Sequence, residues 1–241
     1  LNGFVHQMAE VMTPLDNMAE IVRKNPSTSA YSRLLERFCA PYYSAQATTN
    51  YNRLNNTNVD SVYQKRYFSE RSQNGTALTM SPGNVPVNGR LKFDPGWNSY
   101  FSSTVSQTTN EVALQENMAL MMVPTNAALE RYWNEEGGEV LKDYYKYWDS
   151  IPDHVLAKLI NNNMHNSFIG SVPSKFSTVL NDATNEMGLT KTDIDSVILG
   201  CNGAIYLTNK VFSPTTYASV SFPALINDNM SIFYWAIEEL E

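Results

Sequence analysis

Three histidines are the side chains best suited to acid–base chemistry at neutral pH, and they stand in unrelated parts of the chain. His6 lies in a segment, residues 1–14, that recurs at residues 201–214. The matching position there is Tyr206, which favours packing over catalysis for His6. His154 follows Asp153 at a predicted helix start, where we expect a capping carboxylate and an exposed imidazole. His165 is either a half-buried histidine that braces a strand or a contact to a partner. No phosphate-binding loop, zinc-protease motif or serine-hydrolase motif accompanies them, so the sequence predicts neither catalysis nor a cofactor.

Aromatic rings are the other candidates for a binding site. Exposed rings can stack on the faces of sugars, whereas buried rings build cores. Three rings at helical spacing are expected in the core, namely Tyr144, Tyr147 and Trp148. Three others are candidate ligand contacts: Tyr145, which points away from that face, and Trp97 and Tyr100, which lie in a loop marked by Pro95-Gly96.

The charge and the cysteine content exclude several classes of protein. A net charge of −7 and a pI of about 5.0 argue against nucleic-acid binding, which needs a basic face. Asp193-Ile194-Asp195 could hold a cation, although negative charge in the first turn of a helix is the simpler interpretation. Cys39 and Cys201 are too few for a disulfide-built scaffold, and two separate buried thiols are expected. No apolar run reaches the roughly 18 residues of a membrane span, and no metal site is predicted.

One sequence segment occurs twice along the chain, and this repeat determines the predicted domain organisation. Residues 1–14 read LNGFVHQMAEVMTP and residues 201–214 read CNGAIYLTNKVFSP, with the Asn, Gly, Val and Pro at matching positions. Asp16-Asn17-Met18 recurs as Asp228-Asn229-Met230, and each copy precedes a helical pattern. We interpret residues 1–14 as the terminal strand of a preceding repeat and 16–214 as one domain. Residues 215–241 are then a linker and the first helix of a following repeat.

The elements that must position these residues follow from the spacing of the apolar side chains. The sequence predicts helices over 16–24, 30–39, 140–148 and 153–160, strands within 166–172 and 175–180, a short turn over 190–197, and a terminal strand over 204–212. Residues 42–117 contain Asn-Gly and Pro-Gly turns and are expected to be an insertion rich in strands and loops.

The most specific local pattern is MALMMVPTNAALERYW, residues 118–133. Its unbroken apolar start is typical of a strand buried on both faces. Pro124 should end this strand, and Thr125 or Asn126 should cap the helix that follows.

These stretches resemble the two signature boxes of the fasciclin-type (FAS1) domain. The first box is an apolar strand that runs into Pro-Thr-Asn and an alanine-bearing helix, here at Pro124, Thr125 and Asn126. The second is an Asn-Gly turn, an alternating strand and a Pro, carried here by Asn202, Gly203, Val211 and Pro214. Between the boxes the family has a Tyr-His pair associated with receptor binding, and this chain has Met164-His165 followed by Asn166.

The resemblance implies an α+β fold, a wedge-shaped FAS1-like β sandwich with helices packed on one side. It also implies a non-catalytic adhesion or ligand-binding module from a tandem array, similar to the surface lipoproteins of Bacteroides relatives. Such a module would be extracellular, would contact neighbouring FAS1 domains of its own chain and would bind a protein or glycan ligand, with Met164, His165 and Asn166 as candidate contacts. The alternative function is glycan binding that assists polysaccharide capture, which would use exposed rings such as Trp97, Tyr100 or Tyr145.

Overall fold

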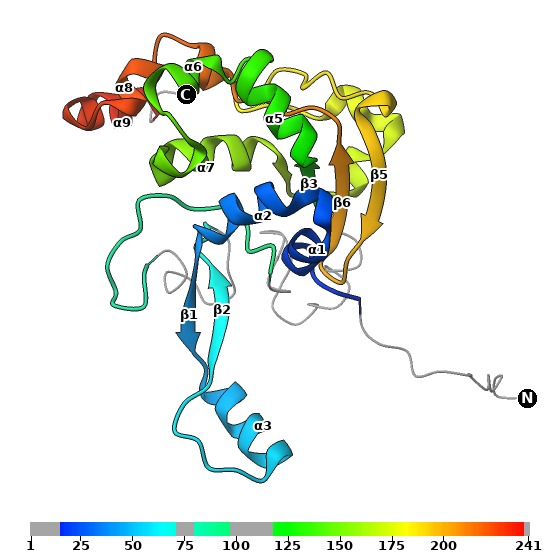
Figure 1. The fold of residues 1–241 in the computed structure, drawn as a ribbon, viewed down its shortest axis with the longest axis vertical. Helices are drawn as coiled ribbons and strands as arrows, with labels where there is room; N and C mark the ends of the chain where they lie inside the picture. Colours follow the sequence, from blue (N-terminus) through cyan, green and yellow to red (C-terminus); the bar gives the residue numbers. More distant parts are fainter. Residues whose placement is uncertain (1–14, 71–79, 97–117, 239–241) are drawn as a thin grey trace, which may run out of the picture.

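A computed structural model describes residues 15–70, 80–96 and 118–238, and it has the expected α+β composition (Figure 1). The α-helices are α1 (Met18–Lys24), α2 (Ser29–Glu36), α3 (Ala45–Asn55), α5 (Asn126–Glu135), α6 (Glu139–Tyr144), α7 (Asp153–Asn162), α8 (Phe222–Ile226) and α9 (Ser231–Glu238). The strands are β1 (Cys39–Tyr43), β2 (Tyr63–Tyr67), β3 (Ala119–Pro124), β4 (Met164–His165), β5 (Ile194–Leu199) and β6 (Gly203–Thr208). Residues 1–14, including the predicted first strand and His6, lie outside the described residues.

Four of these strands form one sheet in the order β4-β3-β6-β5. The two boxes meet at its centre, because β3 and β6 run parallel from the pair Ala119 and Gly203 onward. β4 and β5 add antiparallel edges. Both central strands are buried along their whole length, which confirms the prediction of a strand buried on both faces.

Alternate side chains of the central strands belong to two separate hydrophobic clusters. Met121 and Ile205 belong to the main core, which α1, α2, α5 and α7 cover in Figure 1. Met122 and Tyr206 point to the opposite face, where a smaller cluster includes Phe176 and further apolar residues from the loops that follow. The sheet is therefore a layer between helices on one side and short 3-10 segments and loops on the other.

The first box folds as the sequence predicts. Pro124 is the last residue of β3, and the Thr125 hydroxyl accepts a hydrogen bond from the backbone N–H of Ala128 at 3.3 Å. This bond caps α5. Asn126 does something different, because its Oδ1 accepts from the N–H of Ala30 at 2.9 Å, near the start of α2. One residue of the box thus caps its own helix, and the next binds a different helix.

The second box fixes the start of the domain to its end. The Asn202 side chain accepts from the N–H of Met18 and donates to the carbonyl of Pro95, each at 2.9 Å. Gly203 allows the two central strands to approach closely, since a Cβ atom there would lie 2.5 Å from the carbonyl oxygen of Ala119. Val211 is partly buried against the main core, and Pro214 is buried just before the 3-10 helix η7 (Thr215–Ala218).

The helices predicted over 16–24 and 30–39 are both present, as α1 and α2, but α2 ends earlier than predicted. The Asn17 side chain caps α1 through the N–H of Glu20 at 2.9 Å, as the sequence allows. A 3-10 turn, η1 (Pro26–Thr28), then leads into α2. The helix predicted over 30–39 ends at Glu36, because the chain extends from Cys39 as β1, with Pro41 inside this edge strand.

Within the predicted insertion, β1 and β2 form an antiparallel ribbon that projects from the body with α3 at its tip (Figure 1). α3 was not predicted. It is capped by Ser44 and ends at Asn56 in the left-handed conformation, but Thr48 is its only buried residue. Without an apolar stripe, the sequence carries no helical period there. The later part of this range returns to the main core at Leu91 and Phe93.

Between the boxes the helix α7 is confirmed, but the two strand predictions are wrong. The two stretches predicted as strands form 3-10 helices, η4 (Ile169–Ser171) and η5 (Pro173–Thr178). Pro173 favours this outcome because its fixed φ suits a helical first turn. The predicted turn over 190–197 is instead η6 (Lys191–Asp193) followed by β5.

The packed core does not stop at Pro214. Tyr217, Phe222 and Leu225 all belong to the main core, and the Tyr217 hydroxyl donates to the carbonyl of Val155 at 2.7 Å. The predicted boundary after residue 214 therefore does not coincide with an edge of the core. A short 3-10 turn, η8 (Asp228–Met230), then leads into α9, so the second Asp-Asn-Met does precede a helix.

Candidate functional site

The predicted contact residues between the boxes lie at a sheet edge rather than around a cavity. Met164 is buried in β4, and His165 is largely covered beside β3. The Nε2 of His165 and the Oδ1 of Asn166 are both buried without a hydrogen-bond partner among the described residues. Burial, with the nearby Lys92 ammonium, lowers the pKa of His165 to about 4. At neutral pH this side chain is an uncharged group that faces the protein interior.

The aromatic cluster divides differently from the prediction. Trp148 is partly buried against the main core, with its ring centroid 4.7 Å from that of Trp133. Tyr144 and Tyr147 are instead 58% and 71% exposed, because α6 ends at Tyr144 and the helical period does not continue to Tyr147. Tyr145, expected to be available to a partner, is partly buried against the main core. Trp97 and Tyr100 lie outside the described residues.

The remaining sequence candidates have structural partners. The Asp193 carboxylate is buried, accepts hydrogen bonds from Thr190 and pairs with Lys210 at 3.1 Å. Burial opposes its ionisation, but these hydrogen bonds lower its pKa. In the part of the chain that the structure describes, no cluster of three His, Cys, Asp or Glu side chains could hold a metal ion. Cys39 and Cys201 are both free, and Cys201 is exposed rather than buried.

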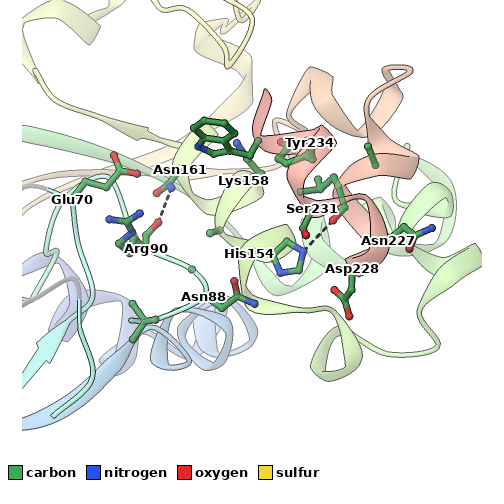
Figure 2. Close-up of a pocket in the computed structure, with 16 residues that line it drawn as sticks. Glu70, Asn88, Arg90, His154, Lys158, Asn161, Asn227, Asp228, Ser231 and Tyr234 are labelled. Carbon is green, nitrogen blue, oxygen red and sulfur yellow. Dashed lines mark hydrogen bonds between the residues drawn. The ribbon is translucent and has the colours of Figure 1, made fainter. Parts of the chain in front are cut away.

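A groove of about 490 Å³ lies between the loop 87–90 and helices α7 to α9 (Figure 2). One wall is the loop from Val87 to Arg90, and α7 contributes His154, Lys158 and Asn161. The other wall is the end of α8, the turn η8 and α9. In Figure 2, Glu70 and Arg90 lie on one side of the groove and Ser231 and Tyr234 on the other. Pockets of about 300–1,000 Å³ are typical of small-molecule sites.

Two α7 side chains attach the walls of the groove to its base. Asn161 uses both ends of its amide, accepting from the N–H of Lys92 at 2.7 Å and donating to the carbonyl of Arg90 at 2.8 Å. His154 is partly buried, and its Nε2 lies 3.0 Å from the carbonyl oxygen of Leu225 in α8. The expectation of an exposed imidazole at this position was wrong, because the ring lies under the α8 wall. The groove is therefore held by contacts that exist before any ligand arrives.

Several polar side chains that line the groove have no such structural role. Asn88, Arg90, Asp228 and Ser231 are exposed, and their side chains make no hydrogen bond or ion pair with any described residue. Aromatic surface completes the lining. The Lys158 ammonium lies 5.5 Å from the centre of the Tyr234 ring, and Trp235 is 61% exposed. The site thus combines convergent donors, acceptors and an exposed indole.

Sequence reasoning missed this groove. Its residues come from a loop near 88, from α7 and from a segment after 224, and no motif links them. The only available signal was the density of aromatic and polar residues in SIFYWAIE, which the repeat assigned to a following domain. Tyr145, one of the predicted contacts, lies near Asp228 of the groove. Burial, together with the Asp228 carboxylate, raises the pKa of Tyr145.

Comparisons with known proteins give no match to this chain: no family model, no curated protein and no solved structure matches it. Among the described helices, none combines the length and the apolar character that crossing a membrane would require.

Proposed function

We propose that this chain contains a FAS1-type domain and acts as a non-catalytic adhesion or ligand-binding module on a bacterial cell surface, as one unit of a tandem array. Its fold would then be a variant of the FAS1 wedge-shaped sandwich with helices on one side. In such an array, several weak sites on one chain give strong attachment through their effective concentration.

The observation that carries the proposal is the meeting of the two boxes. Stretches about 80 residues apart in the sequence form the neighbouring central strands β3 and β6. Their distinctive residues have specific structural uses. Thr125 caps α5, Asn202 joins α1 to the Pro95 carbonyl, and Gly203 permits close strand contact. A chance resemblance in sequence would not require the matched residues to fall at one structural centre.

The adhesive function can be tested with the purified chain coupled to beads at a series of densities. The beads are allowed to settle on surfaces coated with collagen, fibronectin or mucin, and on albumin as the control. We expect retention on at least one extracellular protein, with a steep rise as the chain density increases, because attachment depends on multivalency. Equal retention on all four coatings, or none at any density, would contradict the proposal.

The surface location has its own test. Intact cells that produce the full-length protein are labelled with an antibody raised against this chain and, separately, treated with an added protease. We expect labelling without permeabilisation and loss of the antibody signal after proteolysis. A signal that appears only in permeabilised cells would overturn the location while leaving any binding activity unaffected.

A further inference from the structure

We propose that the groove between the 87–90 loop and helices α7 to α9 binds a neutral oligosaccharide. The inference goes beyond the adhesive function, which could use any surface of the domain. It starts from the unpaired polar side chains on two facing walls. Asn88 and Arg90 come from the loop, and Asp228 and Ser231 come from η8 and α9 (Figure 2).

The hydrogen-bonding character of the lining matches hydroxyl groups. A sugar hydroxyl donates one hydrogen bond and accepts others, so its site needs donors and acceptors side by side. The Asn88 amide offers both, the Arg90 guanidinium only donates, and the Asp228 carboxylate only accepts. A ligand with only acceptors, such as a phosphate diester, would leave the exposed Asp228 carboxylate bonded to water, whereas a hydroxyl group can donate to it.

The charge of the lining also favours a neutral ligand. Among the described residues that line the groove, Arg90 and Lys158 are basic and Glu70 and Asp228 are acidic. These four charges cancel at neutral pH, so neither a strongly anionic nor a strongly cationic ligand gains a net attraction. Charged groups on opposite walls instead act as strong local hydrogen-bonding partners, because bonds to an ionised group are about twice as strong as neutral ones.

The exposed indole supplies the apolar part of the recognition. Trp235 lines the groove and is 61% exposed, although a ring of this size is usually well covered in a folded protein. The C–H face of a pyranose ring is apolar and flat enough to lie on such a ring. Tyr234 directly precedes Trp235 on α9, and its ring lies 5.5 Å from the ammonium of Lys158 on α7.

A peptide in β-strand form fits the groove less well. Peptides that bind as an added strand pair their main chain with the free edge of a sheet. No residue of a described strand lines this groove, whose walls are side chains from a loop and from helices. The walls are also attached to α7 by Asn161 and His154, so a small ligand would meet a site that is already formed.

The test uses the full chain and a glycan array that carries neutral, uronate-containing and sulfated oligosaccharides. Hits are then measured by titration calorimetry with the free oligosaccharide. We expect hits among the neutral hexose oligosaccharides. Trp235→Ala should weaken their binding by about tenfold or more, as expected for loss of a central aromatic contact. Asp228→Asn should weaken binding less, because the amide keeps one acceptor.

The matched control is Phe233→Ala. Phe233 lies on the same helix and is 58% exposed, but it does not line the groove. Its replacement removes an exposed ring of similar size and should change binding by less than about twofold. Both positions are exposed, so both variants should keep the circular-dichroism spectrum and the melting temperature of the parent chain.

Three results would overturn the inference. They are no neutral saccharide bound at millimolar concentration, binding of charged saccharides only, or equal weakening by Trp235→Ala and Phe233→Ala. The outcome is separate from that of the bead experiment. Adhesion that persists in Trp235→Ala would support the adhesive function through another surface, and saccharide binding without adhesion would support the groove alone.

Discussion

Asparagine side chains join segments of this protein that are far apart in the sequence. Asn202 connects α1 with the Pro95 carbonyl, Asn161 connects the 88–92 loop with α7, and the amides of Asn162 and Asn163 both donate to the Phe212 carbonyl. A planar amide that both donates and accepts can satisfy two backbone groups at once. These side chains therefore connect separate elements by hydrogen bonds, as backbone hydrogen bonds connect the strands within a sheet.

Asn202→Ala provides the most direct test of this role. The change leaves the buried Met18 N–H without its partner and removes one of two hydrogen bonds to the Pro95 carbonyl, which still accepts from the Ala19 N–H at 3.1 Å. We expect the free energy of unfolding to fall by about 2–4 kcal/mol, measured by urea denaturation. Asn185→Ala, at an exposed position, should change it by less than about 0.5 kcal/mol. Equal effects of the two substitutions would contradict the assigned role of Asn202.

His165 gives the protein a predictable response to acid. Its pKa is lowered from 6.5 to about 4 by burial and by Lys92, so the unfolded chain takes up a proton at higher pH than the folded one. The free energy of unfolding should therefore fall as the pH drops from about 6.5 to about 4, and this contribution should be constant above that window.

The measurement compares the parent with His165→Gln, which keeps a polar side chain but does not titrate. The stability difference between the two should shift in favour of the variant as the pH falls through this window. The C2 proton signal of His165 in NMR spectra should also stay unshifted above about pH 5.5. A titration midpoint near 6.5 would show instead that the ring is solvated and available to a partner.

At the scale of elements, the first box holds two helices. Asn126 sits at the start of α5, but its Oδ1 accepts from Ala30 and its Nδ2 donates to the Pro26 carbonyl at 2.9 Å, so it acts on η1 and α2. Asn126→Ala should destabilise the protein by about 1–2 kcal/mol, similar to loss of a helix cap. It should also speed the hydrogen exchange of the Ala30 amide. Ala127→Ser, a change at the neighbouring exposed position, is the control and should leave that exchange rate unaltered.

The predictable elements are those whose signal is local. The run from Met118 to Asn126 carries its strand, its stop and its cap within a few residues, and α7 shows its apolar face in the same way. α3 could not be predicted because it buries almost nothing, and η5 because its single buried side chain, Phe176, shows no period that distinguishes a strand from a 3-10 helix. The groove could not be predicted from the sequence for a different reason. Its walls meet only through long-range contacts such as that of His154 with Leu225.

At the scale of the whole molecule, the segment after Pro214 belongs to the folded body. A chain that ends at Pro214 would lose Tyr217, Phe222 and Leu225 from the main core. Removing even one such aromatic ring from a core costs about 3–5 kcal/mol, so we expect this truncated chain not to fold cooperatively. Thermal unfolding followed by circular dichroism measures this directly.

A second truncation, after Ile226, separates core from groove. It keeps the three core residues but removes η8 and α9, and with them Asp228, Ser231 and Trp235. This chain should still melt cooperatively and should no longer bind the saccharide. Cooperative folding of the chain that ends at Pro214 would show that the boundary predicted from the repeat is the true one.

The parallel pairing of β3 with β6 has a consequence for how the chain reaches its fold. Ala119 must find Gly203, and Met18 must find Asn202, which is 184 residues away. Long-range pairings of this kind pay their loop-closure entropy before they return any stabilisation, so refolding should be slow, on the order of milliseconds to seconds. During synthesis the hydrophobic centre stays incomplete until the second box has left the ribosome. Until then α1 and β3 expose apolar surface, and the nascent chain is at its most vulnerable to aggregation in that interval.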